Sequence, residues 1–225
     1  MTGGAVIAVA ARSGADRPDA PRPEAELSDL RFRSLLTAEA WARLPADVRR
    51  RFSKRMTPGD SVVYRGQVVE IEMSRMGRLL AQAARVIGAP LPLHNGPGAA
   101  VVSVTEDQIG QGQVWSRLYV RPTGFPQVIH SAKRFAGPTG LEEHLGLGIG
   151  MALTLTSDDR GLAFLSDHYF LQLGGLRLRL PDWLSPGHLT VTHEDLGDGR
   201  FIFGLDLEHP RLGRLVRQRG VFSDL

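Results

Sequence analysis

The stretch QVWSRLYVRPTGFPQVIHSAKRFAGPTGLEEHL, residues 113–145, decides how this chain folds. Its runs 114–121 and 127–135 are rich in β-branched and aromatic residues, which favour strands. Pro122-Thr123-Gly124 between them is typical of a turn. We therefore predict an antiparallel pair of strands at the centre of the fold.

Short strand-like segments continue after residue 98 on both sides of this pair. The turns that separate them leave no room for crossover helices, so the strands must pair antiparallel. Apolar and polar residues alternate in 201–208, and Leu alternates with Arg in 176–180. Both patterns predict that the apolar side chains point inward and that one face of the sheet is buried.

The segment before the sheet changes character along its length. Residues 1–26 have no periodicity and several prolines, which predicts a disordered tail. Residues 27–57 form a helical lead-in, with Thr37 as the N-cap of one helix and Pro45 in the first turn of another.

The second of these helices is basic. It carries five cations that point mostly outward: Arg49, Arg50, Arg51, Lys54 and Arg55. A solvated helix face explains them, and the alternative is contact with an anionic membrane surface or an acidic partner.

Residues 61–73 read as strands, with Gly66 at a bulge or hairpin. Ser74 then caps an amphipathic helix over 76–87, which Gly88 ends. The run 90–93 that follows, Pro-Leu-Pro-Leu, is an apolar lip, either plain core or the rim of a pocket.

These elements predict an α+β fold. A highly curved antiparallel sheet or incomplete barrel of about eight to ten strands packs on the helix 76–87, after a small N-terminal helical segment. We expect one β-rich domain over 27–225, in which 60–225 holds the sheet and this helix. Either large side chains or a ligand must occupy the concave side of a curved sheet.

Composition and motif spacing exclude several classes of function. The net charge is +3, so no nucleic-acid partner is expected, and the chain has no Cys. The apolar run 5–11 is too short to span a bilayer and no basic residue precedes it, so we expect a cytoplasmic protein. The histidines form no metal-binding spacing and the G-L-G-I-G run at 146–150 lacks the dinucleotide pattern, so neither a metal nor a cofactor is predicted.

Aromatic and cationic residues alternate in the first central strand. Trp115, Arg117 and Tyr119 share one face, where a guanidinium beside aromatic rings can bind the carboxylate or phosphate headgroup of an apolar molecule. The alternative is an outward face of stacked cross-strand pairs.

The second central strand places His130 and Arg134 on one face and Lys133 on the other. Only Lys54 and Lys133 are lysines in this chain. Burial of Lys133 beside Arg134 would lower the pKa of its amine, as in Schiff-base enzymes, with His130 or a Glu moving protons. Lysines usually keep their ammonium in water, and we expect an exposed Lys133.

The segment 139–144 contains two local patterns. Thr139 and Glu142 match a capping box, which predicts a short helix there. Glu143 and His144 invite a metal interpretation, but neighbouring residues on a helix do not share a face.

Three phrases carry a resemblance to a known family: VYRG at 63–66, FPQVIHSAKRFAGPTGLEE at 125–143 and VTHEDLGDGRFIFGLDLEHPRLGRL at 191–215. They resemble a bacterial family catalogued as domain of unknown function 4166, over roughly 30–225. Its members occur alone or appended to Rossmann-type oxidoreductases, which implies a companion role near such an enzyme. The resemblance brings no catalytic residues.

Two functional hypotheses follow, and no diagnostic catalytic signature decides between them. In the first, the protein binds an amphipathic small molecule or lipid, with the headgroup towards Arg117, Arg134 and His130 and the tail against the helix and the lip at 91–93. The alternative is an enzyme that uses Lys133 as a nucleophile on a keto acid or related carbonyl compound.

Overall fold

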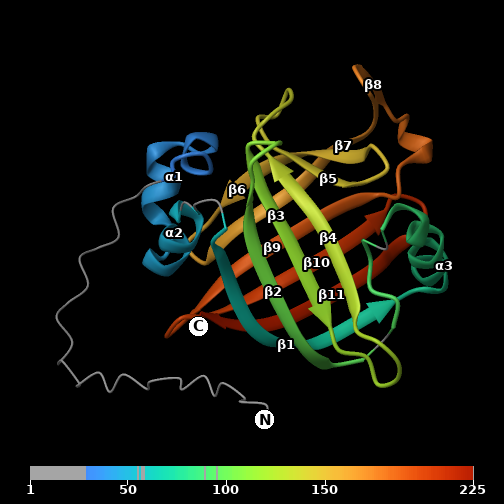
Figure 1. The fold of residues 1–225 in the computed structure, drawn as a ribbon, viewed down its shortest axis with the longest axis horizontal. Helices are drawn as coiled ribbons and strands as arrows, with labels where there is room; N and C mark the ends of the chain where they lie inside the picture. Colours follow the sequence, from blue (N-terminus) through green and yellow to red (C-terminus); the bar gives the residue numbers. More distant parts are fainter. Residues whose placement is uncertain (1–28, 55, 57–58, 89, 95, 225) are drawn as a thin grey trace, which may run out of the picture.

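The computed structural model describes residues 29–54, 56, 59–88, 90–94 and 96–224 (Figure 1). The predicted disordered tail, 1–26, lies outside them. Eleven strands of the described chain form one antiparallel sheet: β1 (Ser61–Met73), β2 (Gly98–Asp107), β3 (Gly112–Tyr119), β4 (Gln127–Arg134), β5 (Glu142–Gly146), β6 (Ile149–Ser157), β7 (Gly161–Leu173), β8 (Leu176–Arg179), β9 (His188–Gly197), β10 (Arg200–His209) and β11 (Gly213–Asp224).

The sheet closes into a barrel of ten strands. The strand order is β6-β5-β4-β3-β2-β1-β11-β10-β9-β7-β8, and β6 also pairs with β7 from Ile149↔Leu171 to Ser157↔Leu162. The predicted curved antiparallel sheet is confirmed, but the barrel is closed and not incomplete, because this last pairing consumes both edges. The fold is mostly antiparallel β with a few helices, so the predicted α+β class is only partly matched. Strand β8 pairs only with β7 and stands outside the ring.

Helical segments cover the two ends of the barrel (Figure 1). At one end lie η1 (Arg33–Leu35), α1 (Ala38–Arg43) and α2 (Ala46–Ser53), the predicted N-terminal helical segment. At the other end lie α3 (Arg75–Ala83) and its continuation η2 (Ala84–Ile87), near η3 (Asp182–Leu184). The amphipathic helix is thus where the sequence placed it, but it covers a barrel end and is not enclosed by the sheet.

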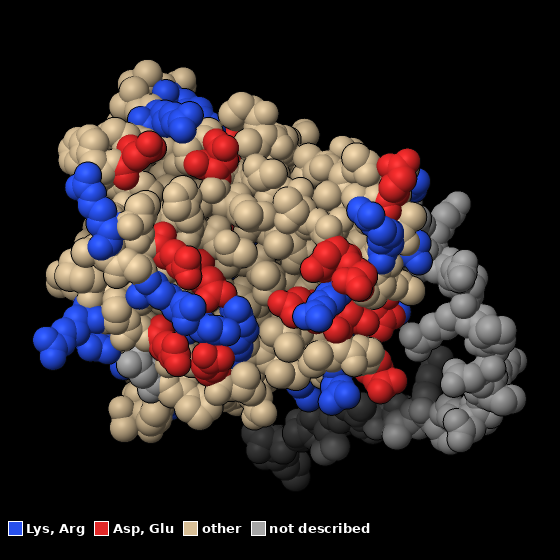
Figure 2. Space-filling model, turned by 180° about the vertical axis from the view of Figure 1, so that it is seen from behind, with Lys and Arg blue, Asp and Glu red and all other residues tan. Residues whose placement is uncertain are grey.

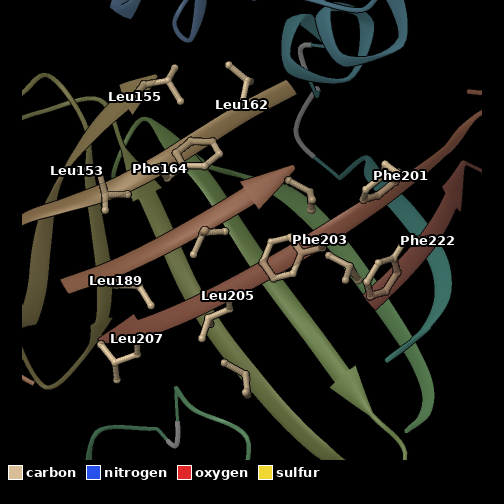
Figure 3. Packing of buried hydrophobic residues seen from close by; sticks show 14 of the residues in the cluster. Leu153, Leu155, Leu162, Phe164, Leu189, Phe201, Phe203, Leu205, Leu207 and Phe222 are labelled. Carbon is tan, nitrogen blue, oxygen red and sulfur yellow. The ribbon is translucent and has the colours of Figure 1, made fainter. Parts of the chain in front are cut away.

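Alternating side chains fill the barrel near the N-terminal helices. Phe201 and Phe203 of β10 point to the same side and are buried there, whereas Leu205 and Leu207 continue the row towards the α3 end (Figure 3). Phe32 completes this end from outside the sheet, with ring centroids 5.2 Å from Phe52 and 4.8 Å from Phe135. Full burial of each such side chain contributes roughly 1.5–3 kcal/mol to the stability of the fold. Packed aromatic side chains therefore close this end of the barrel.

Gly66 has a different role from the predicted bulge or hairpin. Strand β1 runs through it without a break, and the register shift against β11 falls between Val68 and Glu70. A Cβ on Gly66 would lie 2.1 Å from the carbonyl oxygen of Val221 and 2.6 Å from the ring of Phe222. Glycine is required here because the neighbouring strand and its ring approach the backbone directly.

Two further local predictions are wrong. The segment with the capping-box pattern starts strand β5 at Glu142 and forms no helix. Leu176 and Leu178 of β8 are exposed, because the strand that carries them lies outside the barrel and has no core to face.

His193 of β9 provides a test of the packed end. Its ring stacks on Phe201 at 4.2 Å, and burial lowers its pKa from 6.5 to about 3. The folded protein therefore keeps a neutral imidazole, whereas the unfolded chain takes up a proton below about pH 6.5. We expect the free energy of unfolding to fall by up to about 1.4 kcal/mol per pH unit between pH 6 and 5, above the range where carboxylates titrate.

The variant His193→Phe should lose this slope, measured by urea denaturation at each pH. His188→Phe is the matched control, because His188 is exposed on the same strand. Equal slopes in the two variants would contradict the assignment to His193.

Candidate functional site

A layer of charged side chains crosses the barrel interior. Arg117 of β3, Lys133 of β4 and Glu143 of β5 form it, and we call these three residues the charged layer. Lys133 and Glu143 are register partners, and Lys133 Nζ donates to Glu143 Oε2 at 3.0 Å. Arg117 Nη2 lies 3.7 Å from Glu143 Oε1 and donates to Ser131 Oγ at 2.5 Å. One carboxylate therefore serves two cations.

Burial and charge set the ionisation of this layer. The three side chains are at most 8% exposed. Burial alone would raise the pKa of Glu143, but the cations of Lys133 and Arg117 outweigh it and lower the pKa to about 2. Burial lowers the pKa of Lys133, and Glu143 opposes that shift. With all three groups ionised the layer carries one net positive charge.

The layer also leaves one donor free. Arg117 Nε is buried and has no hydrogen-bond partner among the described residues. Aromatic rings cover Lys133, with its Nζ 5.2 Å from the ring centroids of both Trp115 and Phe164. A positive charge with an unused N–H is what a buried anion-binding group requires.

A cavity of about 540 Å³ lies at the α3 end of the barrel. Arg117 and Glu143 are part of its wall, and Tyr169 adds an aromatic ring. Burial raises the pKa of Tyr169, so the phenol stays neutral. Ser185 and His209 are also part of the wall, and the rest of it is apolar. The apolar part comes from α3 and η2, the lip and the strands, and it includes Leu80, Ala84, Ile87, Leu91, Leu145, Ile149, Met151, Leu189, Val191, Leu205, Leu207 and Leu215.

The predicted lip is part of this wall. Gln127 of β4 holds it in place, donating to the carbonyl oxygen of Leu91 at 2.9 Å and accepting from the backbone N–H of Leu93 at 3.0 Å. Leu91 lines the cavity, so the apolar run after the helix borders a pocket.

The structure brings together only some of the predicted site residues. Arg117 lines the cavity, Trp115 packs on Lys133, and Tyr119 is buried on the same face of β3. Lys133 is 4% exposed, so the expectation of a solvent-exposed lysine is wrong. Its ammonium is stabilised by Glu143 and not by water.

His130 and Arg134 lie on the outer face of β4, as the strand alternation predicts. His130 Nδ1 is 2.8 Å from Ser116 Oγ, and Arg134 donates to Asp107 at 2.9 Å. Neither residue is part of the cavity wall described above, so the predicted headgroup residues Arg117, Arg134 and His130 do not lie on one face of the sheet.

Glu143 is the residue that sequence reasoning missed. Its role depends on β5 pairing beside β4, which puts it opposite Lys133. The local capping pattern hid this strand. An apolar strand with one buried lysine was the available signal, because a buried ammonium needs a carboxylate nearby.

The basic helix α2 has partners of its own. The side chain of Arg51 is 4% exposed, donates to Asp224 at 2.9 Å and to Asp195 at 3.2 Å, and stacks over Phe201. Arg50 donates to Asp224 as well. Arg55 lies outside the described residues, and contact of this helix with an anionic surface stays a prediction.

Metal-binding clusters and membrane-spanning helices are both absent from the part of the chain that the structure describes. No group of three or more His, Asp or Glu in that part of the chain is arranged to hold a metal ion. Across residues 29–54, 56, 59–88, 90–94 and 96–224, every helix is too short or too polar to span a bilayer.

The family comparison agrees with the resemblance seen in the sequence. The family model for Domain of unknown function (DUF4166) matches residues 44–222, a range that includes α2, α3 and nearly all of the barrel. A search of curated proteins finds no match.

The charged layer makes a prediction about stability. Glu143→Gln leaves the buried Lys133 and Arg117 without a counterion and should lower the free energy of unfolding by about 3–5 kcal/mol. Lys133→Met should lower the free energy of unfolding by less, because Glu143 still has Arg117 as its partner. The double variant Lys133→Met/Glu143→Gln should recover much of the loss, measured by urea denaturation at neutral pH.

Glu70→Gln is the matched control. Glu70 pairs with Arg217 at 3.3 Å, and both side chains are about a third exposed, so the loss should stay below about 1 kcal/mol. If Glu143→Gln costs no more than Glu70→Gln, the charged layer does not depend on its carboxylate.

Proposed function

The chain belongs to the DUF4166 family, and we propose that its barrel binds an amphipathic small molecule or lipid. The headgroup is acidic and lies at the charged layer. The apolar tail extends through the cavity towards α3. The cavity with Arg117 in its wall carries this proposal.

The size and the lining of the cavity support a ligand of this kind. A volume of about 540 Å³ falls within the range of roughly 300–1,000 Å³ that is usual for small-molecule sites. Such sites combine an apolar wall with a few polar groups, and Arg117, Glu143 and Tyr169 are such groups here. A water-filled cavity with this wall would leave much apolar surface hydrated, which a hydrocarbon tail would relieve.

The charge of the layer supports an acidic headgroup. Glu143 is already paired with Lys133, so the guanidinium of Arg117 supplies the excess positive charge and an unpartnered Nε. Arg offers a planar fork that matches a carboxylate with two hydrogen bonds. An anion bound there would complete the hydrogen bonding of Arg117 and neutralise the layer.

We test the headgroup with dodecanoic acid and dodecanol, which share a tail and differ in charge. A charge-assisted hydrogen bond contributes about 1.5–3 kcal/mol, so Arg117→Gln should weaken dodecanoate binding by roughly 10- to 100-fold and leave dodecanol binding unchanged. Titration calorimetry measures both. The variant should fold, because Lys133 and Glu143 remain a balanced pair.

Two controls define the site. Arg121→Gln removes an exposed arginine just beyond β3 and should not alter dodecanoate binding. Ala83→Trp fills the cavity from α3 and should block both compounds. Native mass spectrometry of protein purified from cells, followed by organic extraction, should yield an acidic lipid-like molecule. An empty protein that binds neither compound contradicts the proposal.

A second candidate function is a Schiff-base enzyme acting through Lys133. It is favoured by the lowered pKa of Lys133, since a neutral amine can attack a carbonyl carbon and expel water. Against it, Nζ is bonded to Glu143, and the described wall of the cavity includes Glu143 and Arg117 but not Lys133. The companion role beside an oxidoreductase stays a prediction.

Borohydride trapping with pyruvate separates the two candidates. The enzyme should gain a stable adduct on Lys133, whereas a binding barrel should show none there. Peptide mapping is unambiguous because Lys54 is the only other lysine, and it serves as the control for non-specific reaction.

A further inference from the structure

Large apolar side chains surround the mouth of the cavity in contact with solvent. We call Met76, Leu79, Trp183, Leu184 and Leu212 the apolar rim. All five are exposed, Leu79 by 61% and Trp183 by 79%. Four of them line the cavity, and Trp183 directly precedes Leu184. Rim and cavity are therefore continuous.

The way α3 packs explains this exposure. The helix faces β11 through Gly77 and Ala81, its buried residues. A Cβ on Gly77 would lie 1.9 Å from the carbonyl oxygen of Leu215. Because the helix meets the strand through small residues, the larger side chains of Met76 and Leu79 are not part of that contact and remain exposed.

The charge on the α3 side of the rim is positive, whereas the η3 side carries one acidic residue, Asp182, directly before Trp183. The segment 75–87 contains Arg75, Arg78 and Arg85 and no acidic residue, and Arg211 precedes Leu212. Within the part of the chain that the structure describes, no ion pair is formed by Arg75, Arg85 or Arg211. Figure 2 shows Lys and Arg side chains along its left edge, the α3 side of Figure 1 viewed from behind.

We infer that the apolar rim and its arginines dock this protein on an anionic lipid bilayer, with the cavity mouth facing the lipid. Trp and Leu side chains enter the boundary between headgroups and acyl chains, while Arg pairs with anionic headgroups. The positive arginines beside the rim and the anionic lipid headgroups are complementary in charge. The inference extends the proposed function, on which it rests only for the claim that the docked mouth exchanges ligand with the membrane.

The opposite end of the barrel fits a bilayer less well. Arg50 and Arg51 of α2 are held by Asp47, Asp195 and Asp224, so much of the charge of that helix is neutralised. Ile109, in the turn between β2 and β3, is exposed there and is not part of the wall of the apolar cavity. Its turn lies at the N-terminal helices, since Arg31 donates to the carbonyl oxygen of Gln111 at 3.0 Å.

Vesicle flotation tests the inference. The full chain should float with vesicles of phosphatidylcholine that contain about one quarter phosphatidylglycerol and much less with pure phosphatidylcholine. Each arginine at such a surface contributes about 1 kcal/mol, so Arg75→Glu/Arg85→Glu should lower partitioning at least about tenfold. Trp183→Gln should lower it roughly tenfold as well.

Matched variants at the other end distinguish the surfaces. Ile109→Gln and Arg49→Glu/Lys54→Glu make the same kinds of change near α2 and should leave partitioning within about twofold. Trp183, Arg75 and Arg85 do not line the cavity, so dodecanoate binding should persist in their variants. Vesicle binding and cavity occupancy are therefore measured separately, and either can fail alone.

Three results would overturn the inference. The first is equal flotation with neutral and anionic vesicles, or none with either. The second is loss of binding in the α2 variants and not in the α3 variants. The third is a dimer in sedimentation velocity that Trp183→Gln dissociates, which would make a second copy of the chain the occupant of the rim.

Discussion

Ten strands enclose more space than the side chains of the strands fill, and this constraint shapes the whole molecule. Barrels of about eight strands have interiors that their own side chains can pack, and each added strand widens the ring. The chain fills one end with Phe32 and Phe52, which come from the helical segment before the sheet. The other end keeps its volume as a cavity under α3.

The charged layer separates these two halves. Replacing a buried ion pair by well-packed apolar residues is often neutral or stabilising, so stability alone does not explain Lys133 and Glu143 in a barrel interior. The layer instead gives one end of the cavity polar groups with a net positive charge. Glu143 neutralises Lys133, which leaves Arg117 as the group that faces the cavity with a donor to spare.

Much of this arrangement follows from local pattern. Period-two alternation placed Lys133 and His130 on opposite faces and marked Phe201 to Leu207 as core, because these properties depend on one strand at a time. Closure and the partner of Lys133 depend on pairings between distant segments. At Glu142 the local sequence matches a helix cap, but the segment forms strand β5. It does so because β4 on one side and β6 on the other supply its backbone hydrogen bonds.

The misjudged leucines of β8 and the exposed leucine of α3 have one cause. Sequence periodicity shows which residues share a face, but the fold decides which face meets the core. On β8 no core is present, and on α3 the contact at Gly77 gives the inner face to small residues. The large apolar residues of α3 thereby come to border the one end of the barrel that remains hollow. Apolar surface that the core cannot use is then available at the entrance of the cavity, where a ligand with a hydrocarbon tail must pass.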